Sequence, residues 1–181
     1  YFISTYFFPK LLREQTWVLY AFVRYPDEIV DTEEKDINKA RVKILEWKDE
    51  WKKAYSGDKD VHPVLRANAV LWNERSIPFE YSDIFLGAML QDTEKNRYKS
   101  YNELEYYMYG SATVVGYMMS HIIGFADGAL PYAKALGEAF QITNFLRDIK
   151  EDLGRGRIYL PKEDMDKYNV EESDFESHTM S

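Results

Sequence analysis

The chain has 181 residues, of which 45% are hydrophobic and 16% aromatic, enough apolar material for a domain with a sizeable core. Its formal net charge of −8 argues against non-specific nucleic-acid binding, which needs a basic surface. The lack of Cys excludes disulfides, thiolate metal sites and a Cys nucleophile, and is compatible with a reducing cytosol.

Helical periodicity runs through almost the whole chain, with no convincing strand and no internal repeat. Helices are predicted at about residues 11–32, 37–55, 64–73, 81–93, 101–125 and 131–153. We therefore expect an all-α fold, with the helices packed around a central space.

The first predicted helix carries a cluster of carboxylates near its end, with Asp27 and Asp31 four positions apart. Pro26 either kinks one helix or begins a new one, and in both cases the two aspartates stay one turn apart. Positions four apart lie on one helix face, about 40° from each other. Two carboxylates aimed at one point repel each other unless a cation lies between them.

The sixth predicted helix carries a second pair with the same spacing, Asp148 and Asp152. These residues continue a polar stripe from Gln141 and Asn144 on a helix with apolar flanks. The stripe contains no Lys, and we predict that it lines a polar pocket rather than facing solvent. Oxygen ligands without Cys or paired His suit Mg²⁺, whose open positions phosphate oxygens typically fill. Two such helices facing each other would bind a diphosphate through bridging metal ions.

A single pair of this kind is more often a solvated charge cluster than a metal site. Here the motif occurs twice, and each copy follows an Arg, Arg24 or Arg147, and large apolar side chains. Surface runs of acidic residues seldom have these neighbours, so the repetition favours a metal site.

The fifth predicted helix has small residues at every fourth position, Ala112, Gly116 and Ser120. They indicate either a close approach of two helices or room for a long apolar ligand tail, and the pattern does not decide between the two. His121 on the same helix is predicted to be a satisfied core residue rather than a ligand. The most apolar run, 112–126, is too short to span a bilayer.

Several of these stretches resemble the squalene and phytoene synthase family. Residues 19–24 and 27–31, Leu-Tyr-Ala-Phe-Val-Arg and Asp-Glu-Ile-Val-Asp, resemble its first aspartate motif. Residues 141–152, Gln-Ile-Thr-Asn-Phe-Leu-Arg-Asp-Ile-Lys-Glu-Asp, are similar to its second motif, and so is the tail 155–161, Arg-Gly-Arg-Ile-Tyr-Leu-Pro. Residues 109–116, Tyr-Gly-Ser-Ala-Thr-Val-Val-Gly, resemble bacterial-type phytoene synthases more than squalene synthases.

The resemblance implies an isoprenoid-synthase helical bundle with the two aspartate motifs facing each other across a central cavity. It implies a prenyltransferase of carotenoid biosynthesis that condenses two geranylgeranyl diphosphates head to head, through a cyclopropylcarbinyl diphosphate, to phytoene. The alternative is a squalene or dehydrosqualene synthase that uses farnesyl diphosphate. Mg²⁺ is the implied cofactor, with NADPH only for squalene formation.

The resemblance also assigns roles to individual residues. The catalytic residues that it implies are Asp27, Asp31, Asp148 and Asp152. The same four residues and Asn144 would hold Mg²⁺. The substrate-binding residues that it implies are Tyr20, Arg24, Tyr109, Gln141, Arg147, Arg157 and Tyr159.

The family's early Ser-Phe motif would precede Tyr1, and the family chain continues for on the order of a hundred residues beyond Ser181. We therefore expect residues 1–181 to be a single helical domain that is truncated at both ends and lacks C-terminal helices. The expected partner is an isoprenoid diphosphate and not a nucleic acid. We expect a cytoplasmic protein, and such an apolar substrate implies peripheral association with a membrane; the oligomeric state stays open.

Two other classes of function also place acidic side chains or this fold in a helical bundle. A non-catalytic assembly or binding protein with the family fold would lose the acidic motifs, whereas this chain keeps all four aspartates. A helical di-iron protein needs Glu-x-x-His pairs, and none of the three His has a Glu three residues before it.

Overall fold

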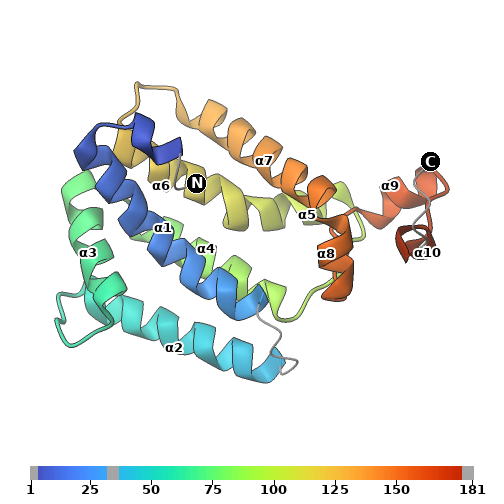
Figure 1. Cartoon of the computed structure of the whole chain (residues 1–181), viewed down its shortest axis with the longest axis horizontal. Helices are drawn as coiled ribbons and strands as arrows, with labels where there is room; N and C mark the ends of the chain where they lie inside the picture. Colours follow the sequence, from blue (N-terminus) through green and yellow to red (C-terminus); the bar gives the residue numbers. More distant parts are fainter. Residues whose placement is uncertain (1–3, 32–36, 177–181) are drawn as a thin grey trace.

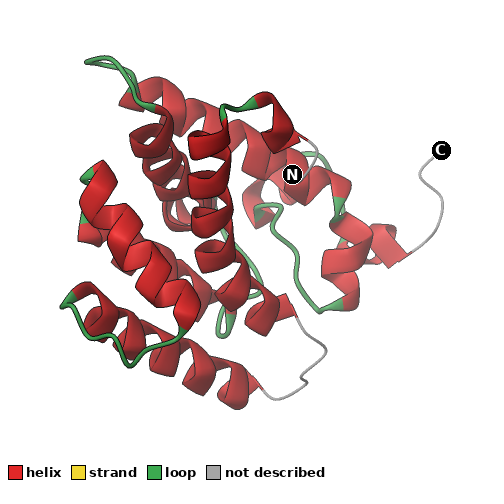
Figure 2. Cartoon of the chain, turned by 60° about the vertical axis from the view of Figure 1, so that its left-hand side comes forward, coloured by secondary structure: helices red, strands yellow, loops and turns green. Residues whose placement is uncertain are grey.

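The computed structural model describes residues 4–31 and 37–176, which form helices joined by loops (Figure 1). The elements in chain order are η1 (Ser4–Phe7), α1 (Lys10–Asp31), α2 (Ile37–Tyr55), α3 (Pro63–Arg75), α4 (Phe79–Asp92), α5 (Tyr101–Met108), η2 (Tyr109–Thr113), α6 (Val114–Ile123), α7 (Leu130–Arg147), α8 (Ile149–Gly154), α9 (Lys162–Lys167) and α10 (Glu172–Glu176). Figure 2 shows no strand in these ranges, where strand-type pairing is limited to an isolated bridge between Arg97 and Ile158. The predicted all-α fold is confirmed.

Helix α1 runs through Pro26 without a new start. A proline cannot donate to the carbonyl one turn earlier, but the buried side chains of this helix hold it in place across the missing bond. Asp27 and Asp31 therefore lie one turn apart on one helix, as predicted. The predicted end of this helix, at Thr32, lies outside the described residues.

An aromatic core holds α1 against its neighbours α2, α3 and α4. The Phe22 ring lies 4.9 Å from the Trp51 ring and 5.3 Å from the Trp72 ring, centroid to centroid. Trp47 and Trp51 on α2 are buried, so the helix predicted at 37–55 packs into the core through these side chains. Burial of large aromatic side chains dominates core energetics, so this cluster fixes the position of the first aspartate motif.

The fifth predicted segment, 101–125, is not one regular helix. Helices α5 and α6 are joined by a π-helical turn, η2, and α6 ends before Gly124, which has a φ of 81°. A π turn adds one residue to the turn and widens the helix, and such turns are frequent at functional sites. The wide turn brings Gly110 against α4, where a Cβ would lie 2.7 Å from the Ala88 Cβ.

The small residues of η2 and α6 serve close helix–helix packing. A Cβ added at Gly116 would lie 3.2 Å from the Ala133 carbonyl oxygen of α7. Ser120 is buried and donates its hydroxyl to the Gly116 carbonyl at 2.8 Å. Of the two interpretations of this pattern, the structure supports close approach at these positions.

The sixth predicted segment, 131–153, is also interrupted. Helix α7 ends at Arg147, Asp148 has φ −100° and ψ 11°, and α8 continues from Ile149 in a different direction (Figure 1). The expectation of one uninterrupted helix is therefore wrong. Asp148 and Asp152 nevertheless remain one turn apart, because the Asp152 N–H donates to the Asp148 carbonyl at 2.8 Å.

The tail that follows α8 lies along the linker between α4 and α5. The Ile158 N–H donates to the Asn96 carbonyl at 3.0 Å, and the Lys162 N–H donates to the Tyr98 carbonyl at 2.8 Å. The Arg97 guanidinium donates to the Gly156 carbonyl at 2.7 Å and to the Glu172 carboxylate. The second motif is thus anchored by a segment about 60 residues earlier in the chain.

Of the helices in residues 4–31 and 37–176, none combines the length and the apolar character needed to cross a membrane.

His121, which was predicted to be a satisfied core residue, has its Nδ1 3.2 Å from the Arg75 carbonyl oxygen.

Candidate functional site

The first aspartate motif is held by an arginine on its own helix. Arg24 donates from Nη1 to the Asp27 Oδ2 at 2.6 Å and from Nε to the Glu28 Oε1 at 3.0 Å. Burial raises the pKa of Asp27, and the negative charge of Asp31 raises it further. Arg24 therefore does not fully compensate for the negative charge of Asp27.

The second motif divides its two carboxylates between different environments. Asp148 accepts from the guanidinium of Arg147 at 2.7 and 2.5 Å, and this hydrogen-bonded partner lowers the pKa of Asp148. Asp152 lies deeper, and burial, followed by the charge of Asp148, raises its pKa to about 6. As in the first motif, one carboxylate of the pair is destabilised by the other.

The Arg-Gly-Arg tail connects the two motifs. Arg157 donates to the Asp31 Oδ1 at 3.2 Å and to the Val30 carbonyl at 2.9 Å, and the Arg155 Nη1 lies 3.5 Å from the same Asp31 oxygen. The charge of Asp31 also contributes to the raised pKa of Asp152. Residues more than 120 positions apart in the chain thus meet at one site.

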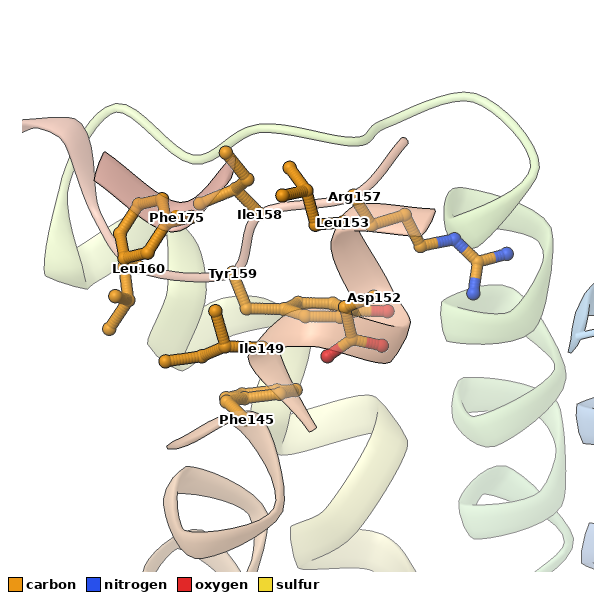
Figure 3. A pocket seen from close by; sticks show the side chains of 9 residues that line it. All are labelled: Phe145, Ile149, Asp152, Leu153, Arg157, Ile158, Tyr159, Leu160 and Phe175. Carbon is orange, nitrogen blue, oxygen red and sulfur yellow. The ribbon is translucent and has the colours of Figure 1, made fainter. Parts of the chain in front are cut away.

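A small pocket lies behind this connection (Figure 3). Its lining is mostly apolar and comes from the end of α7, α8, the tail and α10: Phe145, Ile149, Asp152, Leu153, Arg157, Ile158, Tyr159, Leu160 and Phe175. In Figure 3 the Asp152 carboxylate lies beside the Tyr159 ring, while the Arg157 side chain extends away from the apolar group. The pocket therefore backs the second motif with apolar packing and leaves Arg157 free to reach α1.

The predicted polar stripe on α7 is half-buried beside η2. Gln141 donates to the Ser111 hydroxyl at 3.4 Å, and Asn144 donates to the Gln141 side-chain oxygen at 3.4 Å. These long bonds place the two amides next to the π turn that carries Tyr109. The stripe is packed between elements at its Gln141 end and continues to the carboxylates at the other.

The three predicted tyrosines occupy different surroundings. Tyr20 on α1 is 41% exposed. Tyr109 is half-buried and lies edge-on to Tyr117, with 6.4 Å between the ring centroids. Tyr159 is buried and stacks on Phe145 at 4.2 Å, within an aromatic group that also includes Tyr98 and Tyr107.

The donor set suits a hard cation, although the side chains do not form a closed cage. In the described part of the chain, no three His, Asp or Glu side chains are grouped closely enough to hold a metal ion as they stand. Asp27, Asp31 and Asp148 are instead paired with Arg24, Arg147, Arg155 and Arg157. Burial, followed by a neighbouring carboxylate, raises the pKa values of Asp27 and Asp152, so a cation between the carboxylates would relieve the repulsion that the arginines leave.

The structure adds Asp92 and Tyr107, which sequence reasoning missed. The Tyr107 hydroxyl donates to the Asp92 Oδ2 at 2.6 Å. Burial raises the pKa of Asp92 to about 7, and the charges of Asp31 and Asp27 contribute. Asp92 belongs to no Asp pair and lies in a polar stretch at the end of a predicted helix, a context that is typical of a surface residue. Nothing in its sequence context signals that the fold brings it to the two motifs.

The sequence model of the family described as "Squalene/phytoene synthase" matches residues 1–181. The chain belongs to the squalene/phytoene synthase family. It is 32% identical to the 15-cis-phytoene synthase of Synechocystis sp., over 96% of this chain and 55% of that protein. It is 34% identical to the phytoene synthase of Thermus thermophilus, over 96% of this chain and 58% of that protein.

Solved structures of the same family have the same fold. The squalene synthase HpnC from Alicyclobacillus acidocaldarius superposes with a TM-score of 0.85 at 26% identity, over 98% of this chain and 66% of that one. A dehydrosqualene synthase in complex with ligand superposes with a TM-score of 0.86 at 28% identity, over 97% of this chain and 60% of that one. The chain thus spans about half the length of the curated relatives it matches, from 43% to 60%, and up to two thirds of the solved ones.

Proposed function

We propose that the protein is a Mg²⁺-dependent prenyltransferase that condenses two geranylgeranyl diphosphates head to head to phytoene, in carotenoid biosynthesis. The observation that carries this proposal is the meeting of the two aspartate motifs at Asp31 through Arg155 and Arg157. Four carboxylates with arginines among them suit a diphosphate that arrives with its metal ions. The identity to named phytoene synthases favours the longer substrate.

The proposed residues divide the work between binding and charge control. Asp27, Asp31, Asn144, Asp148 and Asp152 would hold Mg²⁺, which when bound withdraws charge from the leaving diphosphate. Arg24, Arg147 and Arg157, now paired with these carboxylates, would turn to diphosphate oxygens once the cation replaces them as counter-charges.

The proposed reaction then proceeds on the isoprenoid chains. Loss of diphosphate from one substrate leaves an allylic cation, which the double bond of the second substrate attacks, and loss of a proton closes the ring to give a cyclopropylcarbinyl diphosphate. A second loss of diphosphate, rearrangement and loss of a second proton give phytoene. Tyr20 and Tyr109 would face the cations, because an aromatic, water-poor environment stabilises positive charge and prevents its quenching. Gln141 and Tyr159 would complete the surroundings of the substrate.

A second candidate is formation of squalene or dehydrosqualene from farnesyl diphosphate. It is favoured by the two solved structures, which are a squalene synthase and a dehydrosqualene synthase. A requirement for NADPH would separate squalene formation from the other reactions, because that route ends in hydride transfer. Under either candidate the substrate's long apolar chain favours peripheral association with a membrane from the cytoplasmic side.

Product analysis tests the proposal. The protein is incubated with geranylgeranyl or farnesyl diphosphate, with Mg²⁺ or EDTA, and with or without NADPH. We expect phytoene from the longer substrate, formed only with Mg²⁺ and without NADPH. A folded protein that gives no product from either substrate would contradict the proposal and favour a binding or assembly role.

A further inference from the structure

Asp92 is a buried carboxylate that the site described so far does not use. It ends α4, and its Oδ2 accepts the Tyr107 hydroxyl at 2.6 Å. Its Oδ1 is buried and has no hydrogen-bond partner within the described residues. An unpaired buried carboxylate oxygen is unfavourable unless a nearby positive charge or a bound proton compensates for it.

The charges that act on Asp92 come from both sides of the site. Arg157, on the tail of the second motif, favours its ionised form, whereas Asp31 and Asp27, on α1, oppose ionisation. Burial, followed by the charge of Asp92, raises the pKa values of Tyr98 and Tyr159. Asp92 therefore lies where the first motif, the second motif's tail and the aromatic group converge.

Its partner Tyr107 packs against the tail of the second motif, residues 155–161. The Tyr107 and Tyr159 rings stack with 5.6 Å between centroids at 21°, and Tyr159 stacks on Phe145 at 4.2 Å and 13°. Tyr159 is two residues from Arg157, so the position of the stack determines where the Arg157 backbone lies. The bond from Tyr107 to Asp92 fixes the ring of Tyr107 in that stack.

We propose that Asp92 is a positioning residue of the site, which holds Arg157 between the two aspartate motifs through Tyr107 and Tyr159. Among the described residues, the acid that accepts a hydrogen bond from Arg157 is Asp31. Under the proposed function, on which this inference rests, Asp31 must also bind a metal ion. The stack that Asp92 fixes through Tyr107 holds the Arg157 backbone, so the guanidinium stays within reach of the diphosphate when Asp31 turns to the cation.

The test compares Asp92→Asn and Tyr107→Phe with Asp83→Asn as a matched control. Asp83 lies on the same helix and pairs with Lys48 at 2.9 Å, away from the site. Two quantities are measured on each folded variant: the affinity for inorganic pyrophosphate with Mg²⁺ by calorimetry, and the hydrogen exchange of the Arg157 and Ile158 amides. These amides donate to the Asp152 and Asn96 carbonyls in the native tail.

We expect Asp92→Asn to weaken pyrophosphate binding roughly tenfold, which is the usual effect of losing a residue that orients a ligand's direct contacts. The two tail amides should exchange faster in Asp92→Asn and in Tyr107→Phe, while amides of the α1–α3 core and all values for Asp83→Asn stay as in the wild type. Thermal unfolding of each variant is recorded alongside, so that a general loss of stability is visible as faster exchange in the core.

Unchanged pyrophosphate affinity in Asp92→Asn would overturn the inference, even if the tail amides exchanged faster, because the role would then be structural support alone. If the wild-type chain itself does not bind pyrophosphate with Mg²⁺, the proposed function fails first. In that case the exchange of the tail amides still decides the coupling of Asp92 to Arg157, and unchanged exchange in both variants would refute it.

Discussion

The two aspartate motifs have the same spacing but are held in different ways. The first lies on an uninterrupted helix, α1, and its Asp31 is bound by two arginines from a tail that follows α8. The second lies across a break between α7 and α8, and its Asp148 is bound by the adjacent Arg147. Asp31 of the first motif therefore depends on tertiary structure for its partners, whereas Asp148 depends on its immediate neighbour.

This difference shows how the site could respond to a ligand. Arg157 is nearly covered, with 12% of its side chain exposed, and is held at two points, whereas Arg147 is 68% exposed and paired locally. Ordering a long exposed side chain contributes little to stability, while a covered guanidinium with two acceptors contributes more. We infer that Arg157 sets the geometry of the site and that Arg147 is free to adjust.

The largest expected effect is the loss of turnover when either motif is broken. Asp27→Ala and Asp148→Ala each remove a carboxylate that would hold the metal ions, and we expect turnover to fall by roughly two to three orders of magnitude or more. Helical circular dichroism should survive in both variants, because neither side chain is part of the core. If both variants lose their helical signal, the motifs are structural and the comparison of two metal-binding halves no longer holds.

Exchange of each arginine for lysine tests the difference between the two motifs. Arg157→Lys keeps the charge but cannot reach the Asp31 carboxylate and the Val30 carbonyl together, so we expect kcat/KM to fall roughly tenfold to a hundredfold. Arg147→Lys keeps its charge at an exposed position, and we expect a loss of less than roughly fivefold. Steady-state kinetics on the two variants checks this order, and equal losses would mean that burial of Arg157 has no consequence for the reaction.

The next effect concerns stability and pH. Asp92 and Asp152 have folded-state pKa values raised to about 7 and about 6. At pH values between the ordinary pKa of an Asp and these raised values, the folded protein therefore binds more protons than the unfolded chain. The free energy of unfolding should therefore fall as pH rises from 5 to 8, with at most about 1.4 kcal/mol per pH unit from Asp92. Carboxylates with lowered pKa values, such as Asp148, are ionised in both states across this window and add no slope.

Urea unfolding at several pH values of wild type, Asp92→Asn and Asp49→Asn measures this slope. Asp49 is exposed and paired with Lys52 at 2.9 Å, and its pKa is lowered, so its variant should keep the wild-type slope. Asp92→Asn should flatten the slope. If the free energy of unfolding has the same pH slope in all three proteins, the pH dependence comes from Asp152. The second motif would then be the pH-dependent part of the site.

Much of the fold could be predicted because helical periodicity is a local property. The segment predicted at 37–55 coincides with α2, and the aspartate spacing on α1 survives Pro26. The π turn at η2 and the break at Asp148 could not be predicted, because nearby residues all tolerate a helix and both departures arise where one helix meets another.

The site could be predicted in part for the same reason. Each aspartate pair is visible in the sequence because its two members are four residues apart. The tail's contact with Asp31 and the position of Asp92 depend on residues that the fold brings together across 50 positions or more, and no local pattern encodes such a meeting. The raised pKa of Asp152 likewise follows from burial, which only the packed structure defines.

The smallest expected effect concerns how the second motif is held relative to the first. A Cβ at Gly137 of α7 would lie 3.2 Å from the Ala112 carbonyl oxygen and 3.5 Å from the Thr113 Cα, and backbone can give way less easily than a side chain. We expect Gly137→Ala to lower the free energy of unfolding by about 1 kcal/mol, since overpacking exceeds the gain in helix propensity.

Gly87→Ala is the matched control, because Gly87 is on a helix with nothing within 4 Å of an added Cβ, and it should raise stability by about 0.5–1 kcal/mol. Urea unfolding gives both values, and calorimetry with pyrophosphate and Mg²⁺ shows whether the site follows. If Gly137→Ala is less stable but binds as tightly as wild type, the arginines of the tail, rather than the packing of α7, determine where the second motif meets the first. If binding weakens together with stability, the packing of α7 against η2 aligns the two motifs, and the site requires this close interhelical spacing.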